Sequence, residues 1–367
     1  KNIMNVCIIG DGLTSLALTK NLINKKINVD VYCDKKIQKP TPSRTIGISK
    51  NNLEFFKKEI IEISKIKHWK IKKIEIYSQK IKNENIFNFE NKKDTLFYMI
   101  KNDDLYNLLR KDIHKSKYFK SIIIKKSLNE TQLNKKGYDL IINTKSNNFL
   151  EKKYFTNRMK KNYYSVAYTA IIKHKKIDNN IAAQIFTEVG PIAFLPISSN
   201  ETSVVCSLDI RNRKFSNTDI IELINKNNPK YQIINISNLN SFKLSSSILR
   251  NYYKKNILAF GDPLHKIHPL AGQGFNMTIR DIKIFSKIIK DKIKLGMQLD
   301  TSILKDFENQ TKSKNFIFSN GIDFIYEFFN IKKKIKGEKF DKILKLIGNS
   351  NNFNKFLIKL ADKGMNF

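Results

Sequence analysis

Residues 5–33 contain the pattern that most restricts the fold. The apolar run NVCIIG precedes LTSLALTKNLINKK, whose apolar spacing suits a helix, and a second apolar run, INVDVYC, follows. This order predicts a strand, a helix and a second strand that together form a βαβ unit. The segment therefore predicts an α/β fold that begins with a Rossmann-like unit.

The turn of this unit carries a glycine pattern, Gly10-Asp11-Gly12, between the first strand and the helix. Gly10 would permit a tight turn, Gly12 would let the backbone approach a pyrophosphate, and the N–H groups at the helix start would bind its charge. Ser15 occupies the position of the third glycine of this fingerprint, and Asp34 lies where it could accept hydrogen bonds from an adenosine ribose. The pattern predicts a dinucleotide site, although an ordinary turn without ligand remains open, as does the choice between a nicotinamide and a flavin nucleotide.

The net charge is +35, from 68 basic and 33 acidic residues, and a value this high is typical of proteins that bind nucleic acid or anionic membranes. Only seven of the basic residues are arginine, the residue on which base recognition relies most. Lysine is spread along the whole chain. We therefore interpret the charge as a general compositional bias, rank nucleic acid last among the partners, and keep an anionic membrane surface as a secondary hypothesis.

The 367 residues are 41% hydrophobic, enough for one large domain or two intertwined domains. No run of eighteen apolar residues and no secretory pattern is seen, so a cytoplasmic location is expected, with peripheral attachment to the inner face of a membrane left open. Cys7, Cys33 and Cys206 lie in apolar runs without metal-site or disulfide spacing. They are predicted to be buried free thiols, and no metal site is predicted.

A second glycine cluster lies at residues 261–276, GDPLHKIHPLAGQGFN, which holds three of the thirteen glycines and two of the seven prolines. Apolar residues then recur at helical spacing, which predicts a helix from about Gly274 to Leu295 that ends at Gly296. The apolar strand NILAF precedes the cluster. The cluster thus predicts a strand, an exposed backbone loop and a long helix.

This cluster closely resembles the flavin-contacting segment of the para-hydroxybenzoate hydroxylase superfamily, the class A flavoprotein monooxygenases. Within it, the cluster is most similar to the ubiquinone-biosynthesis ring hydroxylases, on its His-Pro-x-Ala-Gly-Gln-Gly run and its Arg280-Asp281 pair. FTEVGPIAFLPISSNETSVVCSL at 186–208 is similar to a second pattern of that subgroup. Arg44 resembles the family's flavin-proximal arginine, and Asn102 begins an Asn-x-x-Leu like the one near the ribityl chain.

The resemblance implies an FAD-dependent monooxygenase that hydroxylates the aromatic ring of a polyprenylated ubiquinone precursor through a flavin C4a-hydroperoxide, with NAD(P)H and O2. The wall beside the flavin ring is expected from Pro269, Gly272, Gln273 and Gly274, whose helix N-terminus would supply positive potential without a mobile charge. The cofactor is expected to contact Gly10, Gly12, Ser15, Asp34, Arg44, Asn102, Gly261, Asp262, Gly274 and Asn276. No side-chain acid or base is assigned, neither His174 nor Tyr168.

One family motif is changed. An Asp-Gly pair that contacts FAD and NAD(P)H in the family is replaced here by Lys145-Ser146, after the strand of residues 139–143. The change leaves three readings open: altered contacts to the reductant, a separate reductase, or a flavin-binding but catalytically silent scaffold in a quinone-biosynthesis complex.

The expected architecture is an FAD-binding domain interrupted by a mostly antiparallel sheet domain. The FAD-binding domain with its C-terminal helices is assigned to residues 1–69, 99–163 and 256–367, and the substrate-binding sheet to 70–98 and 164–255. Strands are predicted near 70–78, 138–143, 164–173, 192–198 and 203–208, and amphipathic helices at 316–330 and 340–364.

Overall fold

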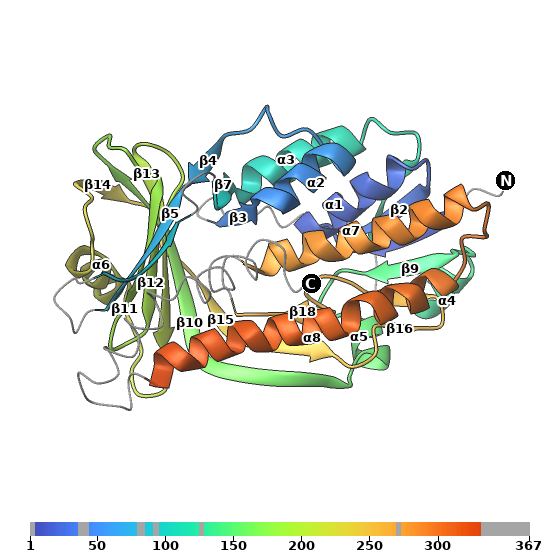
Figure 1. Ribbon diagram of the computed structural model, residues 1–367. Coiled ribbons are helices and arrows are strands. Elements are labelled where there is room, and N and C mark those ends of the chain that lie inside the picture. Colours follow the sequence, from blue (N-terminus) through green and yellow to red (C-terminus); the bar gives the residue numbers. More distant parts are fainter. Residues whose placement is uncertain are drawn as a thin grey trace.

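Three sheets and eight helices form the structure, a computed structural model that describes residues 4–35, 44–78, 85–90, 95–124, 128–268 and 273–331. Figure 1 shows the largest sheet at one end of the molecule and two long antiparallel helices, of which α7 (Gln273–Lys294) runs away from this sheet and α8 (Ser302–Ile331) runs back toward it. The helical segment predicted at 340–364 and the last residues of the chain lie outside the described residues.

The first sheet is mostly parallel and contains the predicted βαβ unit. Its strand order is β16-β17-β9-β1-β2-β8, with strands β1 (Asn5–Ile9), β2 (Asn28–Asp34), β8 (Phe119–Ile124), β9 (Leu140–Asn143), β16 (Tyr253–Lys254) and β17 (Ile257–Ala259). The central strands β1 and β9 are buried because helices cover a parallel sheet on both faces. The α/β prediction is confirmed, and β1 pairs with β2 in parallel register from Asn5 opposite Asn28 onward.

The nine-stranded sheet forms the other end of the molecule. The strands in order are β18 (His265–Lys266), β15 (Asn240–Leu249), β10 (Arg158–His174), β13 (Glu201–Asp209), β12 (Pro191–Pro196), β11 (Ile181–Phe186), β5 (Lys73–Ser78) and β6 (Asn85–Glu90), and β14 (Ile233–Ile236) also pairs with β10. Neighbouring strands run antiparallel except β5 and β11, which are parallel. Helix α6 (Asn217–Lys226) packs its buried Ile220 and Ile224 on the outer face of this sheet.

A three-stranded sheet connects the two larger sheets. Its strand order is β3 (Thr45–Ser49), β7 (Phe97–Lys101) and β4 (His68–Ile71), and neighbouring strands run antiparallel. The single strand predicted at 70–78 is therefore two strands in different sheets, with a break at Lys72, whose N–H donates to the carbonyl of Asn180. The apolar alternation changes phase here, from Trp69 and Ile71 to Ile74 and Ile76, so the two consecutive lysines at 72 and 73 mark the break in the sequence.

The remaining helices cover the six-stranded sheet or cap its loops. They are α1 (Leu13–Ile23), α2 (Lys50–Glu59), α3 (Asn102–Ile113), α4 (Glu130–Asn134) and α5 (Phe149–Tyr154). Helices α1, α3 and α7 pack together over the sheet, and Leu18, Leu105 and Phe285 are fully buried in one core. Helix α8 lies beside α7 and adds Phe307 to this core.

The prediction for α7 was accurate to one residue at each end. Gly296 ends it in a left-handed conformation, φ +68°, and the N–H of Met297 returns to the carbonyl of Lys292. The prediction for α8 was short, because the helix begins at Ser302 rather than near residue 316. Cys7 and Cys206 are buried free thiols as predicted, whereas Cys33 is only half-buried at the end of β2.

Two predicted segment boundaries fall within or beside strands. Strand β10 starts at Arg158, so the boundary at 163/164 lies inside it, at a bulge between Asn162 and Ser165. Strands β4 and β7 pair with β3 instead of the nine-stranded sheet. The assignment of residues 70–98 to that sheet thus applies to β5 and β6.

Candidate functional site

The carboxyl ends of four neighbouring strands bring the predicted nucleotide residues together. In the order β17-β9-β1-β2, these strands are followed or ended by Gly261, Lys145, Gly10 and Asp34. Ligands of open α/β sheets bind at this edge, beyond the carboxyl ends of the parallel strands. The structure therefore brings together at one edge residues that lie as far apart in the sequence as Gly10 and Gly261.

Position 10 favours glycine for two reasons, its backbone conformation and the lack of space for a side chain. Its φ is +119°, and a Cβ there would lie 2.6 Å from Oγ1 of Thr144. Gly12 precedes α1 as its N-cap, and apart from its chain neighbours no described residue has an atom within 4 Å of the Cβ that a side chain would add. The backbone at Gly12 therefore has free space beside the N-terminus of α1, and its contact with a cofactor stays a prediction.

Gly261 connects the two glycine motifs. Its φ is +68°, and a Cβ would lie 2.7 Å from Cγ2 of Thr14, in the first turn of α1. The loop after β17 therefore packs directly against the start of α1. Asp262, the next residue, is exposed at the same edge.

An ion pair joins two residues of this edge. Nζ of Lys145 donates a hydrogen bond to Oδ2 of Asp34, and both side chains are partly exposed. Asp34 is the residue expected at the ribose, and Lys145 is the residue that departs from the family motif. Sequence analysis marked both positions but not their contact.

Three buried oxygens, in the turn after β1, in α1 and at the start of α3, have no hydrogen-bond partner among the described residues. They are Oδ2 of Asp11, Oγ of Ser15 and Oδ1 of Asn102. Asn102 begins α3, and its N–H donates to the carbonyl of Arg44, whose side chain is exposed. Burial is the main cause that raises the pKa of Asp11, and the nearby Asp34 carboxylate adds to it. Buried acceptors without partners fit a ligand that brings hydroxyl groups, such as the ribityl and ribose groups of FAD.

Asn276 fixes the start of α7 to β3. Its Oδ1 accepts hydrogen bonds from the N–H of Ser49 and from Nδ2 of Asn52, both at 2.9 Å, and its Nδ2 donates to the carbonyl of Gly47 at 2.7 Å. The side chain is fully buried. Asn276, predicted to contact the cofactor, thus serves in this structure to position the helix N-terminus.

The rest of the predicted flavin-ring wall is described only in part. Pro269 and Gly272 lie outside the described residues, as does the side chain of Gln273, the first residue of α7. Gly274 is exposed in the first turn of α7, with no described atom within 4 Å of an added Cβ. The first described turn of α7 is therefore accessible on this side.

Buried polar contacts anchor the loop before α7. Nε2 of His265 is hydrogen-bonded to Oδ2 of Asp281, and Nδ2 of Asn315 donates to the other carboxylate oxygen at 3.1 Å. His265 and Asp281 are 1% exposed at their side chains. These contacts join the loop to both α7 and α8.

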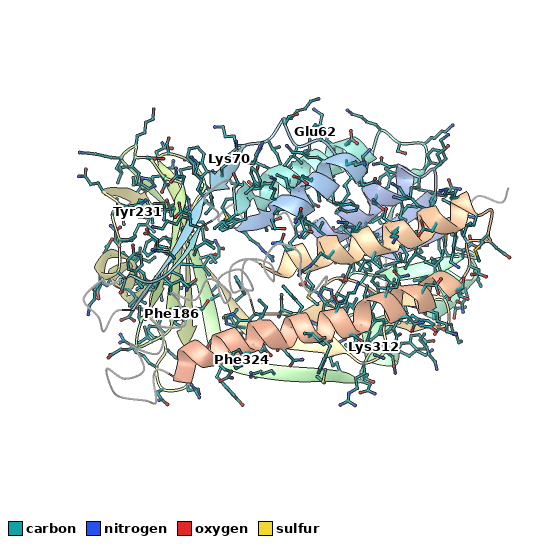
Figure 2. The ribbon with its side chains drawn as sticks, viewed as in Figure 1. Glu62, Lys70, Phe186, Tyr231, Lys312 and Phe324 are labelled. Carbon is teal, nitrogen blue, oxygen red and sulfur yellow. The ribbon has the colours of Figure 1, made fainter. Side chains whose placement is uncertain are left out.

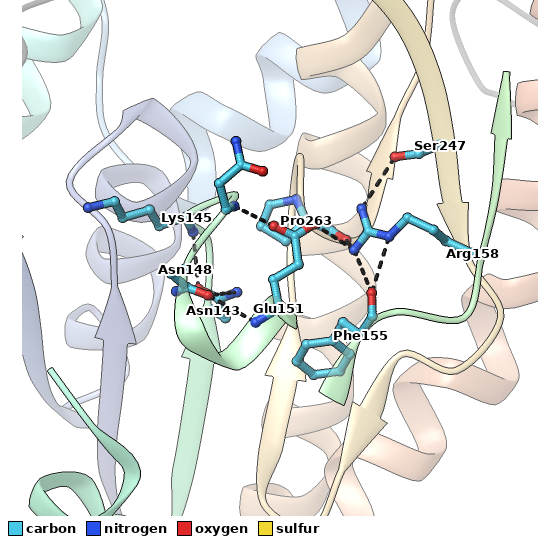
Figure 3. Close-up of polar contacts among 9 residues, drawn as sticks. Asn143, Lys145, Asn148, Glu151, Phe155, Arg158, Ser247 and Pro263 are labelled. Atoms are coloured by element: carbon cyan, nitrogen blue, oxygen red, sulfur yellow. Dashed lines mark hydrogen bonds and ion pairs between the residues drawn. The ribbon is translucent and has the colours of Figure 1, made fainter. Parts of the chain in front are cut away.

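A second network fixes the loop that replaces the family's Asp-Gly motif. Nδ2 of Asn148 donates to Oδ1 of Asn143 at 2.6 Å, and Oδ1 of Asn148 caps α5 by accepting from the N–H of Glu151. Glu151 in turn forms an ion pair with Arg158 at 2.6 Å, with both side chains largely buried. Arg158 also donates to the carbonyls of Phe155 and Pro263, as Figure 3 shows. Through Arg158, the loop after β9 and the loop of Gly261 are held together.

The inner face of the nine-stranded sheet is turned toward this edge. Val204 and Cys206 point to the α6 side and are fully buried, whereas the intervening Val205 is half-buried. Ala193, which pairs with Val205, is also half-buried. Oγ of Ser203, on the inner face, accepts a hydrogen bond from Thr45 of β3 at 2.9 Å. Since β3 also holds Asn276, the N-terminus of α7 and this half-open apolar face belong to one region.

His174 and Tyr231 lie on the opposite side of that sheet. Nε2 of His174 contacts Oγ1 of Thr202 at 3.0 Å, and its ring packs on Tyr231. Figure 2 shows Tyr231 on the outer side of the sheet. His174 is buried rather than solvated, contrary to what is usual for a lone polar residue on a strand, and it does not face the nucleotide edge.

Comparison with known proteins shows which families this chain is similar to. Residues 152–294 match the family model described as FAD binding domain, a region that includes the whole 261–276 cluster. The matched residues make up less than half of the chain, and this segment is similar to an FAD binding domain. The resemblance to the ubiquinone-biosynthesis ring hydroxylases is confirmed by the curated relatives.

Relatives of this chain include the 3-demethoxyubiquinol 3-hydroxylase of Escherichia coli (strain K12), which is 30% identical over 153 residues, with 40% of this chain and 39% of the relative covered. The mitochondrial ubiquinone biosynthesis monooxygenase COQ6 of Dictyostelium discoideum is 26% identical over 183 residues, with 40% of this chain and 37% of the relative covered. The matched regions thus span about two fifths of the length of these relatives.

Solved structures share the fold of this chain over nearly its whole length. The p-nitrophenol 4-monooxygenase PnpA of Pseudomonas putida DLL-E4 superposes with a TM-score of 0.75 at 11% identity, covering 97% of this chain and 96% of that one. Klebsiella pneumoniae HpxO, crystallised with FAD and uric acid, superposes with a TM-score of 0.72 at 11% identity, covering 99% of this chain and 97% of that one. The fold is thus that of the p-hydroxybenzoate hydroxylase-like monooxygenases.

The loop before α7 makes the fold sensitive to acid. Burial lowers the pKa of His268 to about 3, and Lys161 adds to the shift. Because the folded state disfavours protonation, this histidine contributes stability that is present above its unfolded pKa of about 6.5 and is lost as the pH falls toward 3. We expect His268→Asn to reduce the loss of unfolding free energy between pH 7 and pH 5.5 by about 1 kcal/mol, measured by urea denaturation. The same change at exposed His114 is the control; an unchanged pH dependence in His268→Asn would contradict this assignment.

Sequence analysis missed three contacts that build the site. They are Thr14 against Gly261, Lys145 with Asp34, and Arg158 with Glu151. Each joins residues from different elements, so no local spacing could reveal it. Arg158 did carry a weak signal, because arginine is rare in this chain.

Proposed function

We propose that this chain is an FAD-dependent monooxygenase that hydroxylates the aromatic ring of a polyprenylated ubiquinone precursor, with NAD(P)H and O2 as co-substrates. The observation that carries the proposal is the position of the α7 N-terminus, which Asn276 fixes to β3 beside the half-open inner face of the nine-stranded sheet. The names of the relatives support the substrate class.

The six-stranded sheet would hold the nucleotide half of FAD. Backbone N–H groups at Gly12 and the start of α1 would bind the pyrophosphate, and Asp34 would accept hydrogen bonds from the ribose. Asn102 and Asp262 would accept hydrogen bonds from the ribityl hydroxyls. This assignment is supported by the open space at Gly12 and by the buried acceptor of Asn102.

The start of α7 would lie beside the flavin ring. When bound, FAD supplies the redox and oxygen chemistry, and the protein positions the substrate and keeps water away. The unpaired N–H groups of the first turn of α7, near Gly274, would stabilise negative charge on the ring. Helical N–H groups provide this potential without a side-chain charge that could move.

The inner face of the nine-stranded sheet would bind the substrate ring. Its half-buried Ala193, Val205 and Gln184 lie in one row across strands β12, β13 and β11. Small apolar side chains suit a flat aromatic ring, and the amide of Gln184 could bind a polar ring substituent. Two discontinuous segments would thus form one domain, as proposed from the sequence.

A prenylated substrate must be taken from a membrane or from a lipid-binding partner, since its tail is apolar. Helix α8 exposes Phe316, Ile317 and Phe324 toward its C-terminal end and Lys312 and Lys314 before them; Figure 2 shows Lys312 and Phe324. This arrangement supports peripheral attachment to an anionic membrane. Among the described residues, no helix has the length and apolar character needed to cross a bilayer.

Lys145-Ser146 is the reason to consider a silent flavin-binding scaffold as the alternative. The two functions separate in strains that each lack one ring hydroxylase of quinone synthesis. We expect expression of this chain to restore the missing hydroxylated product in one strain, detected by mass spectrometry of extracted quinones. A chain that restores product in none of them, although it folds and carries flavin, would support the scaffold instead.

A further inference from the structure

The side chain of Lys145 crosses the end of strand β1. Its backbone follows β9, which pairs with one side of β1, and its Nζ bonds Asp34 at the end of β2, which pairs with the other side. The three strands are adjacent in the order β9-β1-β2. The lysine must therefore pass over the Gly10 turn to reach Asp34.

The backbone of Lys145 is fixed against that turn. A Cβ on Gly10 would lie 3.3 Å from Cβ of Lys145 and 3.4 Å from its nitrogen. The preceding residue, Thr144, is held by two hydrogen bonds to the carbonyl of Ile9, from its N–H at 3.0 Å and its hydroxyl at 2.9 Å. The base of the lysine is thus rigid, and its ammonium group is directed to the mouth of the turn.

The charge at this edge differs from the family pattern. Asp11 and Asp34 are both acidic residues of the turn region, and an aspartate at position 145 would add a third carboxylate. Lys145 instead supplies a cation between a carboxylate and the helix N-terminus. A dinucleotide places its doubly negative pyrophosphate in this location, where a lysine acts as a point charge for phosphate.

We propose that Lys145 is a phosphate-binding residue of the cofactor site, held ready by Asp34. When the cofactor binds, the Lys145 ammonium group donates to the pyrophosphate and the Asp34 carboxylate accepts from the ribose hydroxyls. Lys145-Ser146, which replaces the family's Asp-Gly pair, would then bind the cofactor through a different contact, and the site would be retained. The inference rests on the proposed binding of FAD at this edge.

The test measures FAD dissociation constants by quenching of flavin fluorescence in Lys145→Met, Lys145→Arg and wild-type protein. Because a charge-assisted hydrogen bond to the pyrophosphate would be lost, we expect Lys145→Met to raise the FAD dissociation constant about tenfold. A larger loss of affinity is not expected, since Lys145 and Asp34 are partly exposed to water. Lys145→Arg should keep most of the affinity. Lys290→Met is the matched control, since Lys290 forms a similar partly exposed ion pair with Glu59 on the surface.

Competition experiments assign the effect to phosphate. ADP should lose about as much affinity as FAD in Lys145→Met, whereas adenosine should lose none, and added salt should weaken FAD binding less in the variant than in wild type. In an Asp34→Asn background, Lys145→Met should still weaken FAD binding, because the lysine acts on the ligand and not only on Asp34.

Equal affinities of wild type and Lys145→Met for FAD would overturn the inference, as would an equal loss for adenosine or no effect in the Asp34→Asn background. Wild-type protein that binds no FAD would overturn the proposed function as well. The two failures are therefore distinguishable in the same titration.

Discussion

Arg158→Met should destabilise the protein by about 3–5 kcal/mol, because it breaks a buried ion pair and leaves the partner charge uncompensated. The side chains of Arg158 and Glu151 are 8% and 14% exposed, and the arginine also donates to the carbonyls of Phe155 and Pro263. The loss is measured as a change in unfolding free energy by urea denaturation. Since Pro263 lies in the loop between Gly261 and α7, FAD affinity should fall with stability.

Arg213→Met provides the matched control. Arg213 is also paired with a carboxylate, Asp219 at 2.6 Å, but its side chain is 60% exposed. An ion pair this exposed contributes little to stability, because water screens the two charges. Similar small losses in both variants would show that the Arg158 network does not hold the two loops together.

Gly190→Ala should have an effect of similar size, about 3 kcal/mol or more, since it combines a strained backbone with a clash. Gly190 has φ +144°, and a Cβ would lie 2.1 Å from the carbonyl oxygen of Ser207. That oxygen belongs to the backbone of β13, so it cannot move without disturbing the sheet. We expect a lower midpoint of urea unfolding and weaker packing between the β11–β12 turn and β13.

Gly137→Ala separates the two causes. Gly137 also has a positive φ, +62°, but no described atom lies within 4 Å of an added Cβ. Only the conformational cost of about 1–2 kcal/mol should remain. Equal losses of unfolding free energy in Gly190→Ala and Gly137→Ala would show that the close contact with Ser207 does not affect stability.

Local patterns were enough to predict the parts of the fold that depend on neighbouring residues. The βαβ unit followed from two apolar runs and a helical stretch, and α7 was placed to within one residue because its apolar stripe ends at Gly296. The two glycine motifs were also found locally. Backbone requirements at Gly10 and Gly261 are visible in the sequence because only glycine meets them.

Features that depend on distant contacts could not be predicted in this way. The first residues of β10 are rich in lysine and largely exposed, and the strand is recognised there only by its pairing with β15. The sequence marks the break at Lys72 but does not show the bond from Lys72 to Asn180 in another segment.

The candidate site shows the same limit. The sequence identified Asp34 and Lys145 separately, one as a ribose ligand and one as a departure from the family. Only the structure shows that they meet across the end of β1. The structure also shows that Asn276 bonds to β3 and α2, which the sequence did not reveal.

The most direct test of the account is the reduction of bound flavin. Purified protein loaded with FAD is mixed with NAD(P)H in the absence of oxygen and in the presence of a prenylated phenol, and the visible absorbance of the flavin is followed. The account predicts that the flavin is bleached. Flavin that remains bound and oxidised would contradict the proposed monooxygenase and leave the chain as a flavin-binding scaffold.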